Sequence, residues 1–195
     1  HMSLEDMALM RAIANMVVFE PTDAEQFSQA IPQIAYNDSP TYIRIQRTAA
    51  DKVYGPDYRF QLGKADVLRD GKDVVIFCSG IMVIRSLAAA EILAEQGIDA
   101  AVVNVHTLKP LDEETVLKYA TKCRAVVTAE NHSIIGALGG AVAEVLAEKC
   151  PTVMRRIGVT DHFGEVGKLD YLEKKFHMTP SDIADAAKSA VAAKN

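Results

Sequence analysis

Residues 73–104, DVVIFCSGIMVIRSLAAAEILAEQGIDAAVVN, decide the fold of this chain of 195 residues. Two short apolar runs, VVIFCS and DAAVVNV, flank a longer segment that ends at Gly97, and glycine is typical of helix C-termini. The two runs do not alternate with polar residues, which indicates strands that are buried on both faces. The stretch therefore predicts two parallel strands joined by a helix.

The same alternation continues to the end of the chain. A helix capped by Asp112, a strand at RAVVTAE, a helix over 134–149, a strand at TVMRRIGV and a last helix opened by Thr179-Pro180 follow one another. We predict an α/β fold in which residues 73–195 form a three-layer α/β/α domain. Its sheet is expected to be mostly parallel but mixed, with helices on both faces.

Residues 1–48 contain two helix–strand pairs, which are too few to form a stable α/β sheet on their own. Ser3 and Asp6 have the spacing of a helix cap and its partner, and Thr22 and Glu25 form a T-x-x-E capping box. Because the chain opens almost at once on a helix cap, we expect this segment to be the remainder of a truncated domain. The missing strands would leave an apolar edge exposed, which predicts association in solution.

Turn signals divide the rest of this part of the chain. The second helix is expected to reach about Tyr36 with a kink or a new turn at Pro32, and TYIRIQR (41–47) alternates as a strand does. Residues 49–72 are expected to be a linker. Asp70-Gly71 predicts a hairpin between the strands on its two sides.

The overall composition excludes some classes of function. A formal net charge of −5 and a pI near 5.5 disfavour nucleic-acid binding, and 6% aromatic residues with no Trp supply few stacking surfaces. No apolar run approaches the roughly 20 residues that span a bilayer, so no membrane partner is expected. No signal-peptide pattern opens the chain.

The cysteines indicate a reducing compartment. Cys78, Cys123 and Cys150 are widely spaced, odd in number and outside any CxxC or Cys/His cluster. Neither a zinc site nor a disulfide framework fits this pattern. We therefore expect a cytoplasmic protein.

The segment ENHSIIGALGG, residues 130–140, is the first candidate site, at the turn from a strand into a helix. In one interpretation its N–H groups bind an anion, and Glu130 and His132 add acid–base chemistry. In the other, which we favour, its glycines let the helix lie close to the sheet, and the segment has a structural or interface role. These glycines are Gly136, Gly139 and Gly140. Neither G-x-G-x-x-G nor a GK[ST] motif is present.

Two further places carry chemically capable residues. Arg44 and Arg47 lie three apart in the strand TYIRIQR, so we expect them on opposite faces. One of them binds a phosphate or carboxylate, or, in the interpretation that the sequence alone favours, it is a solvated or salt-bridged arginine at a strand end. Asp161, His162 and Glu165 lie in the loop TDHFGEVGK, but their spacing matches no metal-ligand pattern, so no metal site is predicted.

The remaining histidines give no catalytic signal. His106 and His177 have no partner within reach by sequence, so core or surface roles are expected for both. No GxSxG, HExxH or Cys/His nucleophile pattern appears.

Taken in order, several segments resemble landmarks of the transketolase family. SLEDMALMRAIANMVVFEPTDA is similar to the second half of the pyrimidine-binding domain, and TYIRIQR to the strand that ends it. DVVIFCSG, VVNVHTLKPLD, TAENHSIIGALGG and GVTDHFGEVG are similar to landmarks of the C-terminal domain. The resemblance covers nearly the whole chain and is strongest to the separately encoded C-terminal section of bacterial transketolases.

Members with the same architecture remain alternatives. They are 1-deoxyxylulose-5-phosphate synthase and the pyruvate dehydrogenase beta subunit. The sequence RIQR, where the synthase would resemble R-Y-P-R-G, favours transketolase. A non-catalytic dimerisation module that keeps the fold is the alternative from another class.

The resemblance implies a division of labour. Thiamine diphosphate and Mg²⁺ bind mainly in an N-terminal domain absent here, and the glutamate that activates the cofactor lies before residue 1. No catalytic residue is expected in this chain, which would act with an N-terminal partner, as a dimer, in two-carbon ketol transfer between sugar phosphates. Arg47 matches an arginine that contacts the sugar phosphate. His1 occupies the place of a substrate-contacting histidine, although a cloning remnant would also read His-Met.

Overall fold

The computed structural model describes residues 3–47 and 50–194. In chain order the elements are α1 (Asp6–Ala12), β1 (Val17–Phe19), α2 (Ala24–Ala35), β2 (Thr41–Ile43), β3 (Asp66–Arg69), β4 (Val74–Cys78), α3 (Met82–Glu95), β5 (Ala100–Asn104), β6 (Thr107–Lys109), α4 (Glu113–Cys123), β7 (Ala125–Ser133), α5 (Leu138–Lys149), β8 (Val153–Val159), α6 (Leu169–Lys175) and α7 (Pro180–Ala193).

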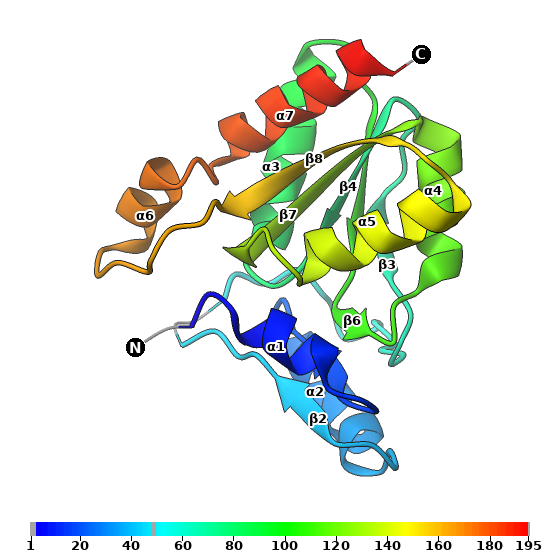
Figure 1. Ribbon diagram of the computed structural model, residues 1–195, viewed down its shortest axis with the longest axis vertical. Coiled ribbons are helices and arrows are strands. Elements are labelled where there is room, and N and C mark those ends of the chain that lie inside the picture. The colour runs from blue at the N-terminus through cyan, green and yellow to red at the C-terminus, as the bar shows by residue number, and fades with distance from the viewer. Residues whose placement is uncertain (1–2, 48–49, 195) are drawn as a thin grey trace.

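A five-stranded sheet in the order β3-β5-β4-β7-β8 forms the centre of the larger domain (Figure 1). β5, β4, β7 and β8 run parallel, and β3 joins one edge antiparallel to β5. Every residue of β4 and β5 is buried, as their unbroken apolar sequence predicts. The predicted mixed, mostly parallel sheet is therefore confirmed.

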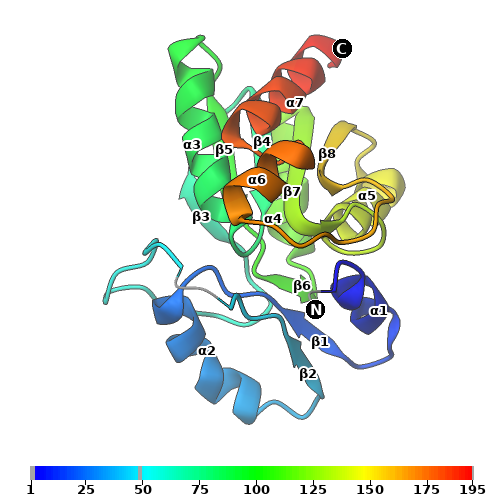
Figure 2. The same cartoon turned by 90° about the vertical axis from the view of Figure 1, so that its left-hand side faces the viewer.

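Helices cover both faces of this sheet and divide its core in two. α3 and α7 pack on one face around Ile76, Leu93 and Ile183. α4 and α5 pack on the other face around Phe77 and Leu138. The side views in Figures 1 and 2 show the resulting three layers, which confirm the predicted α/β/α architecture.

The N-terminal elements form a smaller layer beneath the domain (Figure 2). Its three-stranded sheet has the order β2-β1-β6: β1 pairs in parallel with β2 and antiparallel with β6, a strand that follows β5 in the chain. The short strand β6 was not predicted. Because it belongs to the C-terminal half of the chain, the two halves share one sheet.

The hairpin predicted about Asp70-Gly71 is wrong. β3 and β4 do not pair with each other, because β5 lies between them in the sheet. Gly71 has a different reason to be glycine: a Cβ atom there would lie 2.4 Å from the backbone of Ala100 at the start of β5. Such an approach is possible only without a side chain.

Two helix starts also differ from the prediction. α1 begins at Asp6 with Glu5 as its cap residue, and the Ser3 hydroxyl bonds to Glu5 instead of capping the helix. The side chain that caps α2 is Asp23, which accepts a hydrogen bond from the N–H of Gln26, one residue later than the expected Thr22 cap. The Asp112 cap of α4 and the Thr179–Asp182 capping box of α7 are as the sequence indicates.

The strand expected over 41–47 is shorter than predicted. β2 ends at Ile43 because its partner β1 ends at Phe19, just before Pro21. α2 continues across Pro32 to Ala35. No helix of the part of the chain described here is long and apolar enough to cross a membrane.

Candidate functional site

The carboxyl ends of the parallel strands meet at one edge of the large sheet, where α/β proteins commonly bind ligands. Ser79 follows β4, Asn104 ends β5 and Glu130 lies in β7, and all three side chains are fully buried. The N-terminal layer lies against this edge (Figure 2). Polar side chains of the protein itself are thus buried at this edge of the sheet.

We call the first group of these side chains the seam: Asp6, Glu20, Tyr42, Arg44 and Ser79. Arg44 donates to Glu20 at 2.8 Å and to Asp6 at 3.1 Å. Glu20 in turn accepts a hydrogen bond of 2.6 Å from Ser79, and Asp6 accepts one of 2.7 Å from Tyr42. The seam therefore links α1, β1 and β2 to the end of β4.

The two carboxylates of the seam keep Arg44 positively charged. Burial alone would lower the pKa of Arg44, but the carboxylates of Glu20 and Asp6 outweigh burial and hold that pKa above its ordinary value. Burial and the Asp6 carboxylate raise the pKa of Tyr42 to about 12, so its hydroxyl stays a donor. Only 15% of the Arg44 side chain is exposed, so it is not presented to a ligand.

Arg47 is placed differently. It lies beyond the end of β2 and its side chain is exposed. The expectation that Arg44 and Arg47 occupy opposite faces of one strand is wrong, because both follow the last residue of β2. His1 lies outside the described residues.

The segment 130–140 caps the start of α5 with an acidic side chain of its own. The Glu130 carboxylate accepts hydrogen bonds from the N–H groups of Leu138 at 2.9 Å and Gly139 at 2.8 Å. Burial raises the pKa of Glu130 to about 7, although the two N–H groups oppose this. A Cβ atom on Gly139 would lie 2.9 Å from the Glu130 carboxylate, so glycine makes room for this cap.

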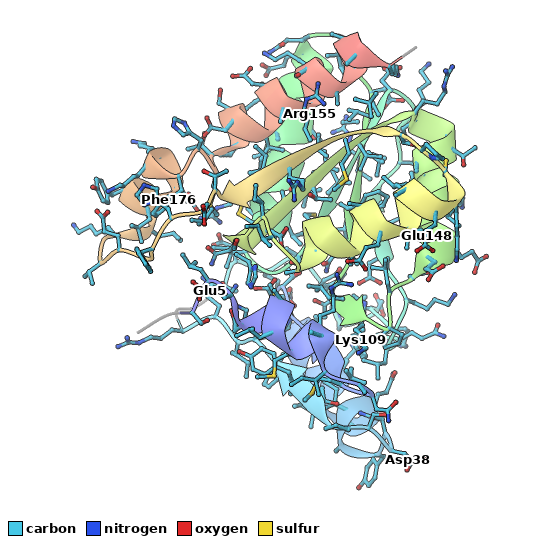
Figure 3. The ribbon with its side chains drawn as sticks, in the orientation of Figure 1. Glu5, Asp38, Lys109, Glu148, Arg155 and Phe176 are labelled. Carbon is cyan, nitrogen blue, oxygen red and sulfur yellow. The ribbon has the colours of Figure 1, made fainter. Side chains whose placement is uncertain are left out.

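The same segment touches the N-terminal layer. Arg11 of α1 donates to the carbonyl of Gly136 at 2.7 Å, and a Cβ atom on Gly136 would lie 2.9 Å from the Ala8 side chain. A Cβ atom on Gly140 would lie 3.5 Å from the Arg11 guanidinium. Lys109, labelled in Figure 3, donates to the carbonyls of Arg11 and Ile13 at the end of α1.

His132 is buried between the two parts of the chain. Its Nδ1 donates to the Ser133 carbonyl at 2.7 Å, and its Nε2 lies 3.7 Å from Asp6. Burial lowers the pKa of His132. Nε2 therefore carries no proton in the neutral ring, and this geometry positions α1 against β7 without a proton-transfer partner among the described residues.

A second polar cluster secures the segment after residue 50. Asp66 accepts hydrogen bonds from Tyr54 at 2.7 Å, Tyr58 at 2.6 Å and Gln26 at 3.1 Å. Asn104 donates to the Tyr54 hydroxyl at 2.8 Å. Burial raises the pKa of Asp66, although the tyrosine hydroxyls counteract it. Sequence reasoning missed this cluster because its members are scattered along the chain without a common motif.

The described histidines and the loop after β8 do not come together as a group of metal ligands. His106 is fully buried, with a pKa lowered by burial to about 3, and His177 is exposed beside Asp182. His162 packs against Phe176, while Glu165 pairs with Lys175. No group of three metal-ligating side chains occurs in the described ranges 3–47 and 50–194.

Two surface hollows among the described residues are smaller than the usual site of a cofactor such as thiamine diphosphate. One lies beside Gly80 and Arg85 and the other beside Arg11 and Glu144, and their volumes are about 80 and 190 Å³. Sites for small molecules and cofactors commonly have volumes of about 300–1,000 Å³. The described residues also supply no cluster of ligands for the cofactor's metal.

Fold and site together define an α/β protein in which a larger α/β/α domain is joined to a smaller N-terminal layer. Residues 63–183 match the family described as transketolase, C-terminal domain, and residues 1–52 match transketolase, pyrimidine binding domain. The chain belongs to the transketolase family.

Two relatives show the range of sequence similarity. The 6-deoxy-6-sulfo-D-fructose transketolase subunit SqwH of Clostridium sp. (strain MSTE9) is 53% identical over 195 residues, covering 100% of this chain and 61% of the relative. The 1-deoxy-D-xylulose-5-phosphate synthase of Caldanaerobacter subterraneus subsp. tengcongensis is 37% identical over 95% of this chain and 30% of the synthase.

A solved structure described as "Split gene transketolase, inactive beta4 tetramer" is 44% identical. It has a TM-score of 0.97 and covers 100% of this chain and 64% of its own. The chain thus spans less than two thirds of the length of each of these proteins.

Proposed function

We propose that this chain is the C-terminal part of a thiamine diphosphate-dependent transketolase-type enzyme and is inactive alone. The assembly transfers a two-carbon ketol group between sugar phosphates, and bound thiamine diphosphate, with Mg²⁺, supplies the carbanion chemistry. The observation that carries the proposal is the seam, which fastens a pyrimidine-domain segment to a C-terminal domain and leaves the carboxyl edge of the sheet to protein contacts.

The residues of this chain act by positioning. We propose that segment 130–140, through Glu130, His132, Gly136, Gly139 and Gly140, is an interface between the two domains rather than a catalytic loop. Residues 1–48 serve as the pyrimidine-domain segment and residues 73–195 as the C-terminal domain, whereas residues 49–72 are a linker only in part, because β3 within them joins the sheet of the C-terminal domain. The free cysteines Cys78, Cys123 and Cys150 fit a cytoplasmic location, which we propose for the assembly.

Arg47 is the proposed contact for the terminal anion of the substrate. Its guanidinium is exposed at the end of β2, where it has access to a phosphate. The similarity to a 6-deoxy-6-sulfo-D-fructose transketolase subunit favours a second candidate donor, a ketose that ends in a sulfonate. Both groups are anions with several oxygens, and an arginine fork binds either.

We also propose that copies of this chain associate within the assembly. The similar solved protein is described as a tetramer of beta chains. Leu9 of α1 and Ile13, which directly follows α1, are exposed apolar side chains of the N-terminal layer. The other partner of this chain in the assembly is a polypeptide that carries the family's diphosphate-binding domain.

Reconstitution tests this function. Ketol transfer from xylulose 5-phosphate or 6-deoxy-6-sulfofructose is measured with the chain alone, the N-terminal polypeptide alone and the mixture, each with thiamine diphosphate and Mg²⁺. We expect activity only in the mixture. Consumption of pyruvate with glyceraldehyde 3-phosphate instead would assign the synthase reaction, and inactivity with every substrate would favour the dimerisation module.

Arg47→Ala tests the anion contact in the same assay. We expect a KM raised about 10-fold or more for the preferred donor, because a charge-assisted hydrogen bond is lost. Arg59→Ala is the matched control, since Arg59 is also exposed but bonds only to nearby carbonyls among the contacts described. An unchanged KM for Arg47→Ala would remove Arg47 from the site.

A further inference from the structure

Residues 160–171 form a continuous exposed segment after β8, which we call the arm. It stands off the body at the left of Figure 1, between the end of β8 and α6. Phe163 and Val166 are 91% and 96% exposed, and Leu169 and Tyr171 add further exposed apolar surface. Apolar side chains presented this fully indicate a surface that another molecule covers.

The arm is held in shape by its own contacts. Glu165 accepts a 3.0 Å hydrogen bond from Tyr171 and pairs with Lys175. The His162 ring packs edge-on against Phe176, with centroids 6.1 Å apart, and Figure 3 labels Phe176 at the base of the arm. A Cβ atom on Gly167 would lie 2.8 Å from the Tyr171 ring, so the fold of the arm depends on glycine there.

The base of the arm is anchored in the core. Arg85 of α3 donates to Glu173 of α6 at 2.8 Å, and both side chains are mostly buried. Because the arm is fixed in advance, a partner that covers it loses little conformational entropy on binding. A preformed apolar surface of this kind is typical of a contact site.

The size of the surface indicates the partner. The four apolar side chains present about 400 Å². One arm on an unrelated protein would bury about 800 Å² in total, which is the size of a crystal contact. Two copies that exchange arms symmetrically would bury about 1,600 Å², the size of a stable specific interface.

We propose that the arm is a contact between two copies of this chain, each arm covering a surface of the other copy. This proposal rests on the proposed association of copies, and it names the surface that mediates one of their contacts. The contact is apolar at Phe163 and Val166 and is rimmed by the charged residues Asp161, Glu165 and Lys168.

Sedimentation velocity over a concentration series tests the proposal with the chain as it stands. Phe163→Ser with Val166→Ser should raise the dissociation constant of self-association roughly 100-fold or more, because two buried side chains are lost. Tyr36→Ser is the control. Tyr36 is 89% exposed and lies near Asp38, far from Phe176 in Figure 3. It should leave the constant unchanged.

The outcomes separate the two proposals. A monomer at every concentration would overturn the proposed association and the arm contact together. An oligomer that the arm variant does not weaken would overturn the arm contact alone. If the arm variant instead loses binding only to the N-terminal polypeptide, the partner is that polypeptide and the symmetric exchange is wrong. Circular dichroism of the variant, expected to match wild type, ensures that loss of association is not loss of fold.

A photocrosslinker at position 163 supplies a readout that does not depend on weakening the contact. In an equal mixture of ¹⁴N- and ¹⁵N-labelled chains, we expect crosslinked peptides that combine both isotopes, which only a contact between copies produces. Crosslinks confined to single-isotope peptides would contradict the proposal.

Discussion

Arg44→Met tests whether the seam fastens the N-terminal layer. The side chain bonds to two carboxylates, those of Asp6 and Glu20, and is only 15% exposed. Methionine retains the apolar stem but leaves both carboxylates without their cation. Breaking a buried ion pair by removing one partner costs about 3–5 kcal/mol. We expect the free energy of unfolding to fall by about 3 kcal/mol, or the Tm by about 6–12 °C for a chain of this size.

Urea unfolding followed by circular dichroism measures this change. Arg47→Met is the matched control: the same substitution three residues later, at an exposed side chain, should change the free energy of unfolding by less than about 0.5 kcal/mol. Adding Glu20→Gln to Arg44→Met should cost less than the sum of the single changes, because one carboxylate no longer needs a partner. Equal stability of Arg44→Met and Arg47→Met would refute the reasoning.

Three further predictions concern the buried groups at the sheet edge. The pKa of Glu130 is raised from 4.5 to about 7, so between these pH values the folded state keeps a proton that the unfolded state releases. The free energy of unfolding of the wild type relative to Glu130→Gln should therefore fall as the pH rises from 4.5 to about 7. Urea unfolding at several pH values measures this difference. The pKa of His106 is lowered to about 3, so NMR should find its ring neutral at pH 5. The stability that the neutral ring contributes should be lost as the pH falls below about 6.5. A ring protonated at pH 5 would contradict its burial. Gly139→Ala should lower the free energy of unfolding by about 1–3 kcal/mol, and the Tm with it, because its Cβ atom would meet Glu130. Gly55→Ala, whose Cβ atom would have no atom within 4 Å, should leave the Tm unchanged. Equal effects of the two substitutions would refute the close packing.

The central sheet could be predicted because its signals are local. The continuous apolar sequences of β4 and β5 indicate by themselves that these strands are buried. Asp112 and Thr179 each cap a helix through a bond to a residue three positions later. The hairpin at Asp70-Gly71 could not be judged in the same way, because the insertion of β5 depends on residues some 30 positions later. The helix α6 was not predicted either, since its seven residues carry no recognised cap.

In the candidate site, too, contacts between residues close in sequence could be predicted and contacts between distant residues could not. The Glu130 cap joins residues eight and nine positions apart, and the glycines that follow it indicated close packing from the sequence alone. The bond between Glu20 and Ser79 joins residues 59 positions apart, and no spacing rule connects them. Arg44 and Arg47 look alike in sequence, and only the end of β1 decides that one is buried in the seam while the other is exposed.

Isothermal titration calorimetry with thiamine diphosphate and Mg²⁺ tests most directly whether this chain holds only part of an enzyme. The cofactor is titrated into the chain alone, into the N-terminal polypeptide alone and into the mixture. We predict no saturable heat with the chain alone and stoichiometric binding with the mixture. Stoichiometric binding by the chain alone would contradict the account, because it would require a complete cofactor site within this chain.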